Sequence, residues 1–201
     1  MKQISMKKTS LKVGFDLDGV LLYNPARIFR PITIVAKTIL RHKSPTKTEF
    51  YYPKSTIEKI LWNIVHWSSL FIAPGFEDIK ELAKEGKINA YIVTSRYDCL
   101  KGDFARWLNK MNAEVVFIDT FHNKNNLQPH IFKEKKINEL GLDLFVEDNW
   151  DIVRHISTHT KTKGLWITNA IDKSISYELK FLSLKSAMNY IRLILSDQIH
   201  P

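Results

Sequence analysis

Two aspartates, Asp16 and Asp18, directly follow the largely apolar run from Leu11 to Phe15. If that run is a buried strand, both carboxylates lie at its rim, and a bend at Gly19 lets them turn toward one point. Such a pair suits an Mg²⁺-assisted attack by one carboxylate on a phosphorus atom. Two nearby aspartates on their own usually mark a solvated turn. The position after a strand-like segment therefore gives this pair its weight.

A hydroxyl-bearing triplet, Thr94-Ser95-Arg96, follows a second apolar segment, Ile88 to Val93. A hydroxyl at such a strand end, backed by backbone amides, can hydrogen-bond a phosphoryl oxygen without competing for its charge. The alternative is that this triplet caps the helix that follows. The triplet alone therefore does not decide between the two interpretations.

A second acidic cluster, Glu147-Asp148-Asn149 with Asp151 close behind, follows the apolar run Leu142 to Val146. Placed beside the first pair of aspartates, it would give Mg²⁺ the oxygen ligands that this ion prefers. The alternative is again capping, because acidic residues favour the first turn of a helix.

Lysines at 133, 135 and 136 precede the apolar run Leu142 to Val146. On a helix whose buried face carries Ile137 and Leu140, Lys133 lies on the same face, four residues before Ile137. Lys136 is the next best placed, whereas Lys135 points away. A lysine on this face could reach the strand ends and balance carboxylates and an incoming phosphate. At most one lysine of the run is expected to be functional.

Short apolar segments alternate with amphipathic helical patterns along most of the chain. The segments expected to be strands are Leu11–Phe15, Ile88–Val93, Val115–Ile118, Leu142–Val146 and Leu165–Thr168. The pattern predicts an α/β fold, a Rossmann-like parallel sheet of about five strands with helices on both faces. In such sheets ligands bind at the carboxyl ends of the strands, where the polar clusters fall.

The stretch from residue 24 to residue 71 interrupts this alternation with two helical patterns, the second opened by the capping box Ser55 to Glu58. We expect a small helical cap inserted after strand one, so that residues 1–23 and 72–201 form the core and 24–71 the cap. The cap pattern is rich in aromatic residues, which could stack a nucleobase or simply pack the cap together.

The composition is that of a globular protein with a net charge of +9 over 201 residues. Such a charge favours anionic partners, but the lysines are spread along the chain, so nucleic acid is possible and not favoured. The start of the chain is polar, and no apolar run of secretory or membrane-spanning length follows it. A single cysteine fits a reducing compartment, and we expect a cytoplasmic protein without a transmembrane segment. No feature of the sequence indicates an oligomeric state.

The order of the polar clusters resembles that of the haloacid-dehalogenase-like superfamily, whose phosphatases carry four motifs. Here they are Asp16-Leu17-Asp18-Gly19-Val20, Thr94, a lysine that opens a helix, and the pair Glu147-Asp148. The resemblance covers the chain from about Leu11 to Thr168. The sequence around Val146-Glu147-Asp148 is similar to that of the deoxyribonucleotidase-like branch of this superfamily.

The resemblance implies a role for each motif residue. Asp16 would be the nucleophile that forms an aspartyl-phosphate, and Asp18 the acid and base. Mg²⁺ would be held by the Asp16 carboxylate, the Asp18 backbone carbonyl and Asp148, while Thr94 and Lys133 grip the phosphoryl group. The retained acid at position 18 favours a phosphatase over an ATP-driven pump, and a mutase stays open.

The sequence departs from the family pattern at two motif positions. The acidic pair begins with Glu147 instead of the commoner aspartate, and the motif lysine is either Lys133 or Lys136. Further candidate substrate contacts, chosen by position, are Ser95, Arg96, Tyr23, Arg27, Lys136 and Glu147.

The resulting hypothesis is an Mg²⁺-dependent phosphomonoester hydrolase acting on a small phosphorylated metabolite, with a nucleotide as the preferred substrate. One alternative keeps the chemistry but changes the substrate to a nucleic-acid end, a phosphorylated lipid or a sugar phosphate. Another is a phosphate-binding regulatory module without catalysis.

Overall fold

The computed structural model describes residues 10–23, 50, 53, 55–60, 71–168 and 172–197. Most of the predicted cap, residues 24–71, and the candidate contact Arg27 therefore lie outside the described residues. Residues 56–60 are helical, and the predicted capping box is present. The Ser55 amide donates to Glu58 Oε2 at 3.0 Å, and the Glu58 amide donates to Ser55 Oγ at 3.1 Å.

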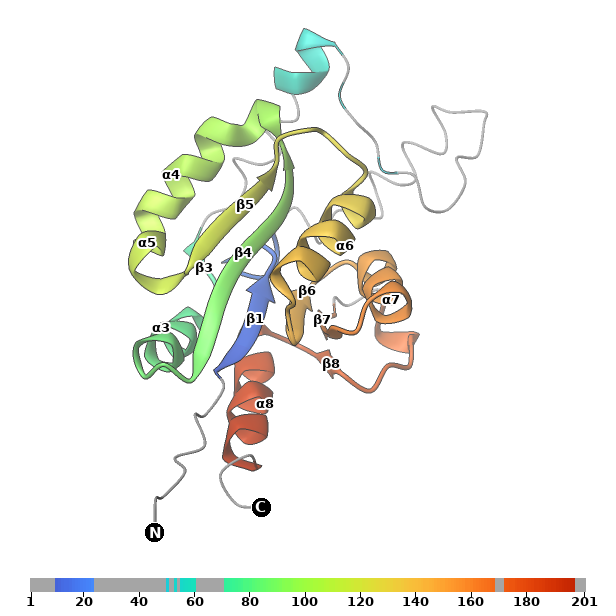
Figure 1. The fold of residues 1–201 in the computed structure, drawn as a ribbon. Coiled ribbons are helices and arrows are strands. Elements are labelled where there is room, and N and C mark those ends of the chain that lie inside the picture. Colours follow the sequence, from blue (N-terminus) through green and yellow to red (C-terminus); the bar gives the residue numbers. More distant parts are fainter. Residues whose placement is uncertain are drawn as a thin grey trace.

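A sheet of six strands forms the centre of the described fold, in the order β5-β4-β1-β6-β7-β8 (Figure 1). Every neighbouring pair is parallel, so the predicted parallel α/β sheet is confirmed. The strands are β1 (Leu11–Phe15), β4 (Ile88–Tyr97), β5 (Asp119–Asn123), β6 (Leu144–Glu147), β7 (Lys163–Ile167) and β8 (Lys180–Phe181). The carboxyl ends of the central strands consequently meet at one edge of the sheet.

Helices cover both faces of this sheet (Figure 1). One face packs against α3 (Phe76–Lys84), α4 (Lys101–Met111), the short α5 (Ala113–Val116) and α8 (Leu184–Asp197). The other face packs against α6 (Pro129–Leu140) and α7 (Trp150–His159). Within the described residues, two 3₁₀ turns, η2 (Asp98–Leu100) and η3 (Asp172–Ser174), lie between these elements. No helix in the described part of the chain is long and apolar enough to cross a membrane.

A separate two-stranded antiparallel sheet pairs β2 (Leu22–Tyr23) with β3 (Phe71–Ile72). Its two strands stand at the two ends of the predicted insertion. Leu22 also donates its amide to the Leu17 carbonyl at 2.8 Å, which closes the turn after β1. Gly19 adopts φ 85° in that turn, a conformation that a glycine reaches without steric cost.

The predicted strand over Val115–Ile118 is wrong. Asn112 adopts a left-handed conformation that ends α4, and the chain then makes the helical turn α5, which leaves the Val115 side chain 81% exposed. The third strand in sequence is instead β5, Asp119–Asn123, whose exposed and half-buried residues suit an edge strand with one neighbour. The sheet also gains β8, and β4 continues through Tyr97.

Alternation along β1 decides which helices face the first aspartate. Val13 and Phe15 belong to the core on the α3 and α4 side, so Gly14 and the next residue of that parity, Asp16, face α6 and α7. Gly14 permits a close approach there, because a Cβ would lie 2.5 Å from Leu142 Cδ1 and 2.7 Å from Phe145 Cδ2. The missing side chain at position 14 therefore leaves room for Leu142 and Phe145 on this face of the sheet.

Candidate active site

Three buried carboxylates gather where β1 and β6 end. Asp16 follows β1 and is tied to β6 by its amide, which donates to the Val146 carbonyl at 3.0 Å. Glu147 is the last residue of β6, and Asp148 follows it. One oxygen from each of Asp16, Glu147 and Asp148 lies within 4.8 Å of the others, and all three residues are buried. Among the described residues this is the one such cluster that could hold a metal ion.

A buried lysine faces these carboxylates from α6. Lys133 Nζ lies 3.0 Å from Asp16 Oδ1 and 2.5 Å from Glu147 Oε2, and its side chain is 2% exposed. It shares a helix face with Ile137, which is fully buried in the core beneath α6. Lys136 instead pairs with Glu139 at 2.9 Å and lies over the Phe121 ring. The geometry therefore brings Lys133, and not Lys136, to the carboxylates.

Three buried carboxylates face the single ammonium group of Lys133, and this excess of negative charge affects their pKa values. Burial raises the pKa of Asp16, and the nearby Asp148 and Asp18 raise it further, against the opposing charge of Lys133. Burial likewise raises the pKa of Glu147 to about 8. Burial alone would lower the pKa of Lys133, but the charges of Asp16 and Glu147 raise it above its usual value. The cluster thus has the charge and the hard oxygen donors that suit a divalent cation such as Mg²⁺.

Glu147 has a further bonding role within its own loop. Its Oε1 accepts the amides of Asp148 at 3.2 Å and of Asn149 at 3.0 Å, while Oε2 accepts from Lys133. The Asp148 carbonyl accepts from Trp166 Nε1 at 3.2 Å. Glutamate in place of the commoner aspartate therefore ties the loop after β6 to α6, and these bonds hold Asp148 beside Asp16.

The hydroxyl triplet lies within the last residues of β4, where the pairing with β5 is irregular. Thr94 pairs with His122 and Tyr97 with Asn123, so Ser95 and Arg96 form a bulge. Thr94 is buried, and its Oγ1 accepts the Arg96 amide at 3.4 Å. The Ser95 hydroxyl is buried without a hydrogen-bond partner. Both hydroxyl residues thus lie at the carboxyl edge of the sheet, as predicted.

Arg96 is bonded to protein carboxylates. Its guanidinium donates to both oxygens of Asp18 and to Asp103, a residue that the sequence analysis did not single out. Asp103 lies in the first turn of α4, where an acidic residue reads as an ordinary helix start. No sequence signal identified this pairing, because its partners are brought together only by the tertiary fold.

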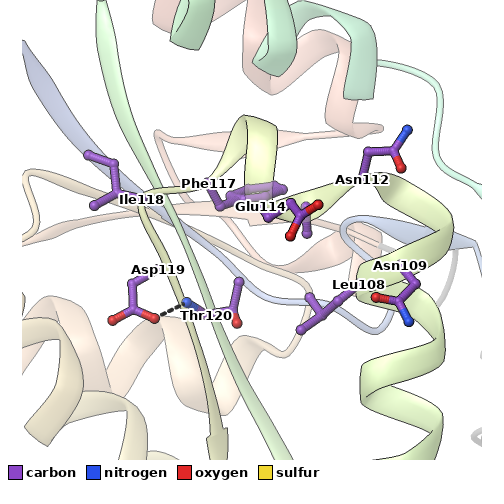
Figure 2. A pocket seen from close by; sticks show the side chains of 9 residues that line it. Leu108, Asn109, Asn112, Glu114, Phe117, Ile118, Asp119 and Thr120 are labelled. Carbon is purple, nitrogen blue, oxygen red and sulfur yellow. Dashed lines mark hydrogen bonds between the residues drawn. The ribbon is translucent and has the colours of Figure 1, made fainter.

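The other predicted substrate contacts, Tyr23 and Arg27, are not part of the carboxylate cluster. Tyr23 lies on β2, after the Asp16 loop, and is 44% exposed; its ring stacks on that of Phe71 with centroids 4.8 Å apart. Arg27 is outside the described residues. A surface depression lined by Leu108, Asn112, Asp119 and Thr120 lies at the start of β5 (Figure 2). Because the sheet is parallel, the start of β5 lies at the opposite end of the strands from the carboxylates, which follow β1 and end β6. We therefore assign the candidate site to the carboxylate cluster.

Comparisons with known proteins find similarity in structure but not in sequence. No protein-family model matches the chain, and no curated protein matches it in sequence. Solved structures do match its fold. A haloacid-dehalogenase-superfamily hydrolase from Ehrlichia chaffeensis superposes with a TM-score of 0.53 at 15% identity, over 94% of this chain and 98% of that one.

Two further structures agree with that result. A haloacid-dehalogenase-like hydrolase from Xanthomonas campestris has a TM-score of 0.55 at 11% identity, covering 96% of this chain and 100% of the other. CbbY from Rhodobacter sphaeroides, solved in complex with phosphate, has a TM-score of 0.58 at 12% identity, covering 88% and 95%. The chain therefore has the fold of the haloacid-dehalogenase-like hydrolases, as the four motifs predict.

Proposed function

We propose that this chain is a divalent-metal-dependent phosphoric monoester hydrolase that works through an aspartyl-phosphate on Asp16. The observation that carries the proposal is the buried cluster of Asp16, Glu147 and Asp148, in which Lys133 forms ion pairs with Asp16 and Glu147. The fold that the chain shares with haloacid-dehalogenase-like hydrolases supports it.

The residues of the site divide the chemistry among them. An Asp16 oxygen attacks phosphorus, and the bond to the leaving oxygen breaks as Asp18, in its acid form, gives that oxygen a proton. Lys133 holds Asp16 in place and offers positive charge to the phosphoryl oxygens, while the buried Thr94 hydroxyl lies at the same strand edge to hydrogen-bond one of them. In the second step Asp18 takes a proton from the water that attacks phosphorus, which releases phosphate and the Asp16 carboxylate.

Mg²⁺ would be held by the carboxylates of Asp16 and Asp148, together with the Asp18 backbone carbonyl that the family resemblance implies. When bound, it neutralises charge on the phosphoryl group, which makes attack by a carboxylate electrostatically tolerable. The raised pKa of Asp16 and of Glu147 supports this assignment, because an added cation would favour their ionised forms.

A 5′-nucleotide is our first choice of substrate. The stacked rings of Tyr23 and Phe71 support it, because they are 44% and 47% exposed and lie on the paired strands β2 and β3, of which β2 follows the Asp16 loop. An exposed aromatic face next to a phosphate site is suited to stacking a base. A panel of nucleotides and sugar phosphates tests this choice: equal turnover of both classes would contradict it.

Hydrolysis of para-nitrophenyl phosphate tests the reaction itself. We expect turnover that needs Mg²⁺, is abolished by EDTA, and falls by at least about a thousandfold in Asp16→Asn, because the nucleophile is lost. Asp119→Asn, the same change at an exposed aspartate at the opposite end of the strands, is the matched control and should keep full activity. Equal rates for wild type and Asp16→Asn would contradict the proposal.

A further inference from the structure

The guanidinium of Arg96 is buried between two carboxylates on the α4 side of the sheet. Its Nε donates to Asp18 Oδ2 and its Nη2 to Asp18 Oδ1, both at 2.7 Å, while Nη1 donates to Asp103 Oδ2 at 2.5 Å. The Arg96 side chain is 1% exposed and that of Asp103 is 3% exposed. Every guanidinium nitrogen thus already donates to a protein carboxylate.

The fold supplies this arrangement from three separate elements. The bulge in β4 displaces Arg96 from the regular ladder, next to the turn that follows β1. Asp103 comes from the first turn of α4 and is held in turn by Arg106, whose Nε donates to Asp103 Oδ1 at 3.0 Å. A chain of ion pairs therefore runs from Asp18 through Arg96 and Asp103 to Arg106, whose side chain is 57% exposed.

A two-point bond of this kind fixes more than a distance. Two parallel donors set both the plane and the direction of the Asp18 carboxylate, whereas a single donor would leave it free to rotate. Proton transfer needs the carboxylate within hydrogen-bond reach of the reacting oxygen, and a small misplacement costs much of the rate.

We infer that Arg96 is a positioning residue, which orients the Asp18 carboxylate for proton transfer and does not itself bind the substrate. This inference rests on the proposed phosphatase activity. It also gives Arg96 a different role from the substrate contact that its position in the sequence suggests, because its nitrogens are already engaged by Asp18 and Asp103.

A double-mutant cycle on para-nitrophenyl phosphate hydrolysis tests the inference. We expect Arg96→Gln to lower kcat by about tenfold or more with little change in KM, because orientation and not binding is lost. In the Asp18→Asn background the same Arg96→Gln change should have no further effect, within about twofold, because Arg96 acts through Asp18. Arg96→Lys, which keeps the charge but loses the fork, should recover only part of the rate.

Arg106→Gln is the matched control, since Arg106 binds the same Asp103 but is not bonded to Asp18. It should retain the wild-type kcat. Thermal unfolding of each variant separates lost folding from lost positioning, and Arg96→Lys replaces Arg96→Gln in the cycle if the latter does not fold.

The outcomes distinguish this inference from the proposed function. A raised KM with unchanged kcat in Arg96→Gln would overturn it in favour of a substrate contact, and equal losses in the wild-type and Asp18→Asn backgrounds would overturn it in favour of a merely structural role. Either result, with activity that still depends on Asp16, leaves the proposed function standing. Wild-type protein without turnover, or turnover indifferent to Asp16→Asn, would contradict both.

Discussion

At the scale of single residues, the site is a balance between burial and charge. Asp16, Glu147 and Asp148 are each buried, and Lys133 is the cation that contacts two of them. Removing a carboxylate from water costs free energy unless it is paired, so each acid in excess of the lysine raises the cost of folding. The site is therefore built at the expense of stability and favours the binding of a cation.

This balance predicts how stability depends on pH. An unfolded glutamate loses its proton near its ordinary pKa of 4.5, whereas burial raises the pKa of folded Glu147 to about 8. Between these values the folded state binds more protons, so the free energy of unfolding should fall as the pH rises, by at most about 1.4 kcal/mol per pH unit. Urea unfolding in EDTA across this range measures it.

Glu147→Gln is the variant that isolates the effect, because the amide does not titrate. Its stability should depend less steeply on pH than that of the wild type over the same range. A wild-type stability that rises between these pH values, or an identical slope in Glu147→Gln, would show that Glu147 is ionised in the folded, metal-free protein.

At the scale of elements, strand alternation and one glycine align the site. Gly14 leaves room for Leu142 and Phe145, which pack where a side chain on β1 would otherwise lie. The same parity points Asp16 toward α6 and Lys133. The direction of Asp16 therefore follows from the alternation of β1, and Gly14 leaves room for the packing on the same face.

Gly14→Ala should consequently destabilise the protein by about 1–3 kcal/mol, because its Cβ would overlap Leu142 and Phe145. Gly102→Ala is the matched control: nothing lies within 4 Å of a Cβ there, and alanine favours the helix α4 by up to about 1 kcal/mol. Denaturant midpoints compare the two. A Gly14→Ala protein as stable as the control would mean that the core around β1 yields easily.

Sequence reasoning recovered the elements whose pattern is local. The run Leu11–Phe15 matches β1 residue for residue. The spacing of Lys133 to Ile137 predicts that both lie on one face of α6, and both are buried there. The apolar run Val115–Ile118 was misassigned, because a strand and a short helical turn after α4 present similar composition. Local propensity is a weak guide to such short segments.

The bonding of Arg96 could not be predicted in the same way. Arg96 and Asp18 are 78 residues apart in sequence, and their contact depends on a bulge in β4 that no residue pattern marks. Glu147 likewise appeared to be a departure from the family motif, while the structure uses its longer side chain to join Lys133 to the loop after β6.

At the scale of the whole molecule, the fold positions the motif residues, whereas the net charge acts on anions at a distance. The parallel sheet brings motifs from β1, β4 and β6 to one edge although they are widely separated in sequence. The charge of +9 adds a long-range attraction for anions that does not depend on those contacts.

Ionic strength should therefore act on encounter and not on chemistry. We expect KM for a phosphate ester to rise severalfold between low and physiological salt, with kcat nearly constant because the buried ion pairs are screened little. Steady-state kinetics in a salt series measure both constants. A KM independent of salt would exclude electrostatic steering, and salt-sensitive retention of an oligonucleotide would instead favour a nucleic-acid substrate.

The most direct measurement of the central claim is the covalent intermediate itself. Wild-type protein mixed with a labelled phosphate ester, quenched within one turnover and digested, should carry the phosphoryl group on the peptide that contains Asp16. With an aryl phosphate, whose leaving group needs no added proton, Asp18→Asn should accumulate more of it, because hydrolysis of the aspartyl-phosphate needs the base. Turnover with no label on that peptide in either protein would contradict the account.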